Sequence, residues 1–337
     1  MSFVLPPAFA GLDPDSQSQA RSLLQPFSMQ ADEVVMEEGE EDISLAFIAK
    51  GAVALEIKGT RVGVAGVRDM IGEMELFTGL PRLATARATT PVDLLVLGPD
   101  QYIELCETGN PVVFQLEQAS LRRVGDRLRA MDDAIRDLTS GQPYELHPQR
   151  EGLLARLNPF KKQSHPEFDV TEVLASSPLF QWASASILDE LGANFSQRSF
   201  RNDQTICAQG EPGETMFVLA EGQVDVILQI TPSHAERIAT LEPGMAFGDG
   251  AILHGCPRSA TCIAKGNVSA LMMDRKQFLI LVEGMDPVAS VFRQALIRNL
   301  VNHVIKAGER LIDISKVHQQ SEEQLYRGTP VSAVWRD

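Results

Sequence analysis

The hydrophobic and polar positions along this chain form two kinds of pattern, and the order of these patterns occurs twice. A helix-like lead-in at 8–27 precedes short strand-like runs such as LAFIAKGAVALEIK at 45–58. A long segment at 114–138 then places apolar residues at steps of three and four, which is the spacing of one helix face. The same order returns from a lead-in at 177–195 to a final helix at 287–315. The patterns therefore predict two similar units, each built of strands and followed by a long helix.

Each of the two long helices carries a heptad-like seam of apolar residues. The first seam consists of Phe114, Leu121, Val124, Leu128, Met131, Ile135 and Leu138, with Glu117 as a gap. The second consists of Ile297, Leu300, Val304, Ala307, Leu311 and Ile314. At 1.5 Å per residue the first helix is about 37 Å long. Such a seam suits either packing on its own unit or a coiled coil in a homodimer through 114–138 and 297–314, and the pattern leaves both interpretations open.

One stretch between the strands and the long helix is repeated without insertion. It reads IGEMELFTGLPRLAT at 71–85 and FGDGAILHGCPRSAT at 247–261. Each copy has a Gly followed by an acid, a short apolar run, a second Gly and Pro-Arg. A helical turn that begins after a Gly presents free backbone N–H groups to an anion, and an Arg holds phosphate oxygens through parallel donors. Because a carboxylate beside such a site would repel a bare anion and can accept hydrogen bonds from hydroxyls, the pattern predicts a sugar-phosphate ligand.

Both stretches resemble the phosphate-binding cassette of cyclic-nucleotide-binding domains, as in kinase A regulatory subunits and catabolite activator proteins. The family pattern is roughly F-G-E-L-A-L followed by P-R-A-A-T, and the flanking strands extend the resemblance over most of the chain. It implies a mainly β fold with flanking helices: two eight-stranded jelly-roll barrels, each with N-terminal helices and a long C-terminal helix. We expect a first domain at 1–140, a linker at 141–169, a second domain at 170–318 and a polar tail at 319–337.

In the first unit, the resemblance places Glu73 on the ribose 2′-hydroxyl and Arg82 on the cyclic phosphate. The implied ligand-binding residues are Gly72, Glu73, Met74, Glu75, Arg82, Leu83 and Ala84. Glu75 and Leu83 stand where the family has small residues. At about 6 Å and an effective dielectric near 20, the Glu75 carboxylate would repel a phosphate by roughly 3 kcal/mol unless it points to solvent.

In the second unit, the implied residues are Phe247, Gly248, Asp249, Gly250, Ala251, Arg258, Ser259 and Ala260. The phosphate side follows the family, with small residues at Gly250 and Ala251. Asp249 departs from it, since its carboxylate falls about 1.5 Å short of a Glu and weakens a hydrogen bond of about 1.5–3 kcal/mol. His254 is expected to face solvent, with no catalytic role.

Composition excludes several classes of function. The formal charge of −15 and a pI near 4.9 argue against a broad nucleic-acid surface. No apolar stretch has the length of a membrane span, and the N-terminus lacks the pattern of a secretory signal. The four cysteines show no metal-binding spacing, so we expect free thiols in the cytoplasm.

These observations favour a non-enzymatic cyclic-nucleotide sensor, because the sequence shows none of the common catalytic motifs. We expect no cofactor and no metal, and cAMP slightly ahead of cGMP, with a cyclic dinucleotide left open. The signal would reposition the long helices and pass to an unidentified effector protein. We expect neither a kinase-inhibitor segment before the first unit nor a helix-turn-helix after the second. The alternative is a scaffold whose units have lost the ligand and serve only in assembly; an enzyme ranks third.

Overall fold

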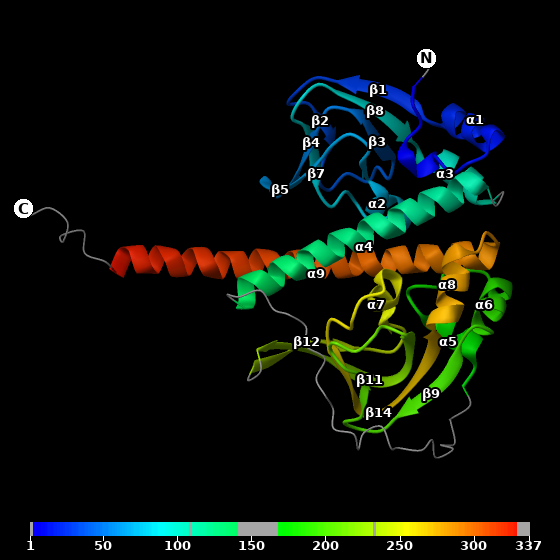
Figure 1. Cartoon of the computed structure of the whole chain (residues 1–337), viewed down its shortest axis with the longest axis vertical. Coiled ribbons are helices and arrows are strands. Elements are labelled where there is room, and N and C mark those ends of the chain that lie inside the picture. The colour runs from blue at the N-terminus through cyan, green and yellow to red at the C-terminus, as the bar shows by residue number, and fades with distance from the viewer. Residues whose placement is uncertain (1–2, 108–109, 141–167, 232–233, 329–337) are drawn as a thin grey trace, which may run out of the picture.

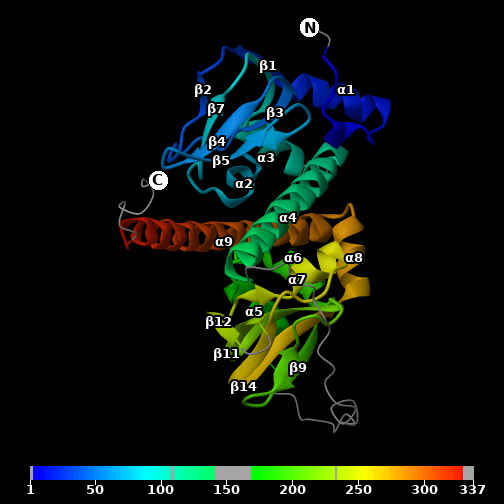
Figure 2. The same cartoon turned by 60° about the vertical axis from the view of Figure 1, so that its left-hand side comes forward.

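The computed structural model describes residues 3–107, 110–140, 168–231 and 234–328. Two β units lie on opposite sides of two long crossing helices, α4 (Pro111–Ser140) and α9 (Pro287–Gly328), as Figures 1 and 2 show. The predicted linker at 141–169 falls almost wholly outside the described residues. Within them, no helix is both long and apolar enough to cross a membrane.

The first unit is a sandwich of two antiparallel four-stranded sheets, ordered β1-β8-β3-β6 and β2-β7-β4-β5. The strands are β1 (Gln25–Met29), β2 (Val34–Met36), β3 (Leu45–Lys50), β4 (Val53–Ile57), β5 (Thr60–Ala65), β6 (Met70–Ile71), β7 (Thr85–Ala88) and β8 (Val92–Leu97). The helices around it are η1 (Pro7–Phe9), α1 (Pro14–Leu23), α2 (Glu73–Thr78) and α3 (Pro99–Glu107). This is the predicted eight-stranded jelly-roll arrangement, with two open sheets in place of a closed barrel.

The second unit repeats this plan with fewer, longer strands. It contains α5 (Val170–Ser176), α6 (Ala185–Gly192), β9 (Ser196–Phe200), β10 (Thr205–Cys207), β11 (Thr215–Thr231), β12 (His234–Leu241), β13 (Ala246–Phe247), α7 (Asp249–His254), β14 (Thr261–Asp274) and α8 (Arg275–Glu283). By sequence position, β11 corresponds to β3 and β4 together, and β14 to β7 and β8 together. The predicted eight strands are therefore six here.

A glycine with a positive φ marks the bend in both units. Gly51 (φ 84°) separates β3 from β4, whereas Gly222 (φ 84°) lies inside β11, where the pairing with β14 shifts register. A Cβ at Gly222 would lie 2.3 Å from the carbonyl oxygen of Asn267, so a larger side chain would push the two strands apart. The bend is thus the same in both units, although only the first unit breaks its strand there.

Some predicted boundaries differ from the observed ones. The lead-in helix ends at Leu23, and Phe27, expected on its apolar face, lies in β1 with about half of its surface exposed. The final helix continues to Gly328 instead of ending at Ser315. Part of the predicted tail is thus helical, because the polar sequence after the seam still favours a helix.

The seam residues of α4 and α9 whose side chains the structure describes are buried or half-buried inside the chain. Leu121 and Val124 of α4, and Ile297, Leu300 and Val304 of α9, belong to one core cluster that includes residues of both β units. The first sandwich has a smaller cluster of its own, and so has the second unit, whose strands form one six-stranded sheet. The seams therefore serve packing between the units. A homodimer through 114–138 and 297–314 stays a prediction.

Glu117, the gap in the first seam, forms a buried ion pair with Arg293 of α9. Its Oε2 accepts a hydrogen bond from Nε of Arg293 at 2.9 Å, and its Oε1 accepts from Ser290 and Gln294. Arg293 also donates to the carbonyls of Leu281, Val282 and Gly284. Burial raises the pKa of Glu117, although Arg293 and the hydrogen bonds oppose this effect. One pair thus joins the helices of the two units where their apolar seams meet.

We predict that Glu117→Ala lowers the free energy of unfolding by about 3–5 kcal/mol, because it leaves the Arg293 charge buried without a counter-charge. Urea unfolding followed by circular dichroism measures the loss. Asp126→Ala, which removes an exposed acid from the same helix, should change stability by less than about 0.5 kcal/mol. Equal effects of the two changes would contradict the importance of the pair.

Candidate functional site

In both units, the repeated stretch forms a strand, a glycine turn and one short helix. Gly72 (φ 86°) leads from β6 into α2, and Gly248 (φ 85°) leads from β13 into α7. A Cβ at either glycine would lie 2.5 Å from Nη1 of the unit's arginine, which is Arg82 or Arg258. The glycine therefore supplies a left-handed backbone and also the space for the guanidinium.

The two arginines are anchored by equivalent groups. Nη2 of Arg82 donates to the carbonyl oxygen (2.7 Å) and the hydroxyl (3.1 Å) of Ser44. Nη2 of Arg258 donates to the carbonyl oxygen and the hydroxyl of Thr215, and its Nη1 donates to the carbonyl of Gly248 at 2.7 Å. Both arginines are buried. Ser44, directly before β3, and Thr215, the first residue of β11, thus hold the guanidinium of their unit against the glycine turn of the cassette.

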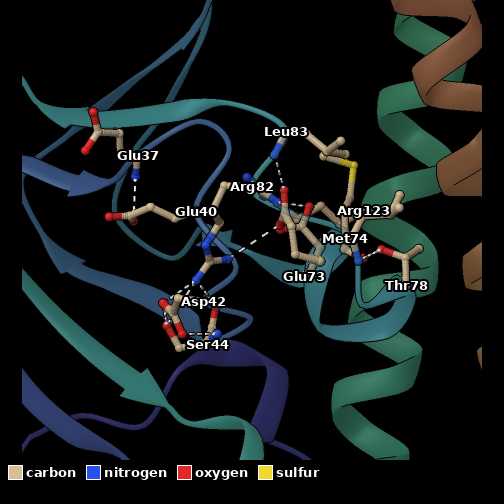
Figure 3. A network of polar contacts seen from close by, with 12 residues as sticks. Glu37, Glu40, Asp42, Ser44, Glu73, Met74, Thr78, Arg82, Leu83 and Arg123 are labelled. Carbon is tan, nitrogen blue, oxygen red and sulfur yellow. Dashed lines mark hydrogen bonds and ion pairs between the residues drawn. The ribbon is translucent and has the colours of Figure 1, made fainter.

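In the first unit, two carboxylates approach Arg82. Asp42 forms an ion pair with Nη2 at 2.8 Å, and Oε2 of Glu75 lies 3.6 Å from Nη1. Figure 3 shows Asp42 and Ser44 on one side of the guanidinium and the cassette turn on the other. Partial burial alone raises the pKa of Asp42, but hydrogen bonds from Ser44 and Arg82 outweigh it and leave the pKa below its usual value.

Glu75 is buried instead of pointing to solvent. Its Oε1 accepts a hydrogen bond from the backbone N–H of Leu83 at 2.9 Å, while its Oε2 faces Arg82. The sequence predicted either repulsion of a phosphate or an outward carboxylate, and it did not anticipate a pairing with the arginine. The reason is geometric: the first turn of α2 aims position 75 at the segment before β7, which carries Arg82 and Leu83.

In the second unit, small residues stand where these carboxylates are. Gly213 and Ala251 correspond in the repeat to Asp42 and Glu75, and a Cβ on Gly213 would lie 2.5 Å from that of Ala251. The two positions are therefore direct neighbours. Within the described residues, no carboxylate lies within ion-pair distance of Arg258, and its hydrogen bonds use carbonyl and hydroxyl oxygens.

The cassette acids contact the long helix that follows each unit. Glu73 is buried, and its Oε1 lies 3.7 Å from Nε of Arg123 and 3.5 Å from Nη2 of Arg127, both on α4. Asp249 accepts a hydrogen bond from Nδ2 of Asn299 on α9 at 2.8 Å. The two acids predicted to meet a sugar hydroxyl thus already meet polar groups of a helix.

His254, at the end of α7, packs against the other unit's helix and does not face solvent as expected. A Cβ on Gly125 of α4 would lie 2.5 Å from its ring, so the helix approaches closely only because Gly125 lacks a side chain. Burial, together with the charge of Arg129, lowers the pKa of His254 and favours the neutral ring; Asp126 and Asp249 act in the opposite direction. The contact links the second cassette to α4.

The remaining predicted residues lie around these groups. Met74 and Leu83 are half-buried against the large core cluster, and Ala84 and Ala260 are half-buried after the arginines. Phe247 is buried in the second sandwich, whereas Ser259 is exposed. Among the described residues, no group of three His, Cys, Asp or Glu side chains could hold a metal ion.

Sequence reasoning missed the partners of the cassette residues. Ser44 and Thr215 occupy matching positions of the internal repeat, so an alignment of the two units could have paired them. Arg123, Arg127 and Asn299 lie on the polar flanks of the long helices, and no local signal connects them to the cassettes.

We predict opposite effects for two neighbouring glycines of the second cassette. Gly248→Ala should destabilise the protein by at least about 1–2 kcal/mol, because the backbone is left-handed and the new Cβ would displace Arg258. Gly250→Ala is the matched control: its Cβ would meet nothing within 4 Å, and it should be neutral or stabilising by up to about 1 kcal/mol. Urea unfolding measures both, and similar losses would show that the turn geometry does not hold the arginine.

The model of the cyclic nucleotide-binding domain family matches residues 26–108 and 197–284. A cyclic nucleotide-gated potassium channel of Mesorhizobium japonicum is 36% identical over 123 residues, which are 36% of this chain and 33% of the channel. The chain thus spans about a third of the length of this curated relative.

Solved structures that match this chain include regulatory parts of protein kinase A. The regulatory domain from Toxoplasma gondii, crystallised with cAMP, is 19% identical with a TM-score of 0.32, covering 82% of this chain and 88% of that one. The regulatory subunit of a cAMP-independent protein kinase A from Trypanosoma brucei is also 19% identical with a TM-score of 0.32, covering 83% and 81%.

The two segments that match the family model together make up about half of the chain, and each contains one cassette with its glycine, acid and buried arginine. The protein therefore belongs to the cyclic nucleotide-binding domain family and carries two such domains in tandem.

Proposed function

We propose that this protein is a non-enzymatic cyclic-nucleotide sensor that passes its signal to a protein partner through its long helices. The observation that carries the proposal is the buried Arg258. Its guanidinium has five N–H donors, and the contacts to Thr215 and Gly248 use three of them. A cyclic phosphate carries one negative charge and would supply the counter-charge, and Asp249 would accept a hydrogen bond from the sugar. We expect cAMP slightly ahead of cGMP.

A route from the second cassette to α9 supports the signalling part of the proposal. Asn299 occupies Oδ2 of Asp249, so a sugar hydroxyl would compete with it for that carboxylate. The preceding residue, Arg298, donates to the carbonyl of Phe77 at 2.6 Å, at the end of α2 in the first unit, and lies over the Trp182 ring at 4.1 Å. A ligand that binds one arrangement of α9 better than the other would shift the equilibrium between them.

The alternative function is an assembly scaffold without a ligand. The carboxylates around Arg82 favour it for the first unit, and the buried Glu117–Arg293 pair joins the long helices of the two units. The cysteines among the described residues form no disulfide, which suits the cytoplasmic location that we infer.

We predict saturable binding of cAMP or cGMP to the purified protein, with an affinity at least about thirtyfold lower in Arg258→Ala, because truncating one partner of a buried charge pair costs about 2–5 kcal/mol. Calorimetric titration with cAMP, cGMP and cyclic di-GMP measures it. Arg237→Ala is the control, since this arginine is exposed and pairs with Asp225 outside the cassette. If the folded protein binds none of the three nucleotides, the result would favour the assembly-scaffold function.

We also predict that nucleotide binding changes the fluorescence of Trp182, because Arg298 of α9 lies over its ring. The measurement uses a Trp335→Phe background, which leaves Trp182 as the single tryptophan of the two in the sequence. Asn299→Ala should shift the ligand-free emission towards the bound value and reduce the change on binding. An unchanged response in Asn299→Ala would separate Asp249 from the movement of α9.

A further inference from the structure

We infer that the carboxylate of Glu75 is a built-in counter-anion that occupies the phosphate position of the first unit, so that this unit is closed to cyclic nucleotides and the second unit is the nucleotide-binding one. The inference rests on the proposed function, since it decides which of the two cassettes carries it. It uses the contacts of Glu75, the charge around Arg82 and the different residues at the same positions of the second unit.

The contacts of Glu75 are those that a bound phosphate would need. A carboxylate offers two anionic oxygens on one carbon, as a cyclic phosphate offers two on its phosphorus. One oxygen of Glu75 accepts from the N–H of Leu83 at 2.9 Å, and the other lies 3.6 Å from Nη1 of Arg82. The side chains of Glu75 and Arg82 are only 6% and 1% exposed. The carboxylate thus spans the arginine and the next backbone donor in a place shielded from water.

The guanidinium of Arg82 already has counter-charges without a ligand. Asp42 pairs with Nη2 and Glu75 faces Nη1, so the single positive charge meets two carboxylates. A cyclic phosphate would add a third negative group to the same guanidinium. Water screens part of the repulsion from the half-exposed Asp42, but the repulsion from the buried Glu75 is poorly screened. The first unit therefore disfavours the ligand that its arginine would otherwise attract.

The second unit differs at these same two positions. Gly213 and Ala251 replace the two carboxylates, and they are direct neighbours of each other. Two further positions of the cassette differ in apolar character. Met74 and Leu83 of the first unit pack against the large core cluster. The second unit has Gly250 and Ser259 at these positions, and Ser259 is exposed. The residues around the arginine thus leave more room for an anion in the second unit than in the first, although the shorter Asp249 is a departure of the second unit.

The test measures stoichiometry by calorimetric titration of the full chain with cAMP and cGMP. The wild type should bind about one equivalent, lost in Arg258→Ala and kept in Arg82→Ala. About two equivalents in the wild type, or binding that survives Arg258→Ala and is lost in Arg82→Ala, would overturn the inference. Absence of binding in the wild type would instead count against the proposed function, and a second probe then decides the inference separately.

The second probe is inorganic phosphate, with Arg258→Ala as the background so that the first unit is observed alone. Phosphate should raise the unfolding temperature of Arg258→Ala/Glu75→Ala by several degrees more than potassium chloride of equal ionic strength, because it fills the position that Glu75 leaves. Addition of Arg82→Ala should abolish this difference. Glu56→Ala in place of Glu75→Ala is the matched control, since Glu56 pairs with the partly exposed Arg87 and should give no such gain.

If Arg258→Ala/Glu75→Ala shows neither nucleotide binding nor a phosphate-specific shift while it remains folded, Glu75 does not hold an anion position and the inference is wrong. A phosphate-specific shift of the same size in Arg258→Ala, where Glu75 is still present, would also contradict it.

Discussion

A buried guanidinium is the constraint on which both cassettes depend. Arginine keeps its charge at every ordinary pH, and a buried charge is costly unless polar groups and a counter-charge surround it. The protein meets the first requirement in the same way twice, with a carbonyl and a hydroxyl from Ser44 or Thr215. The glycine at the start of each short helix is part of this solution, because any side chain there would collide with the guanidinium.

The source of the counter-charge differs between the two units. The first supplies its own carboxylates, Asp42 and Glu75, and the second has Gly213 and Ala251 at those positions. A duplicated domain can thus keep the same backbone and the same arginine while one copy becomes a packing module and the other stays suited to an anionic ligand. On this view the sensor and scaffold hypotheses describe different halves of one chain.

The long helices connect these local arrangements. Each cassette acid contacts the helix that follows its own unit, and each cassette also touches the helix of the other, through His254 at Gly125 and Phe77 at Arg298. The Glu117–Arg293 pair fastens the crossing itself. A change at one cassette is therefore placed to act on both helices, since they form one packed core with residues of both units.

The sequence by itself determined the duplication, the positions of glycine, acid and arginine in each cassette, and the two long helices with their apolar seams. These features depend on short-range spacing and on hydrophobic periodicity, which a linear pattern contains. Only the tertiary structure decided that the seams pack against each other within the chain, that the gap at Glu117 meets Arg293, and that Glu75 turns inward to Arg82. Each of these is a contact between segments far apart in the chain or a choice of direction for one side chain, and local patterns specify neither.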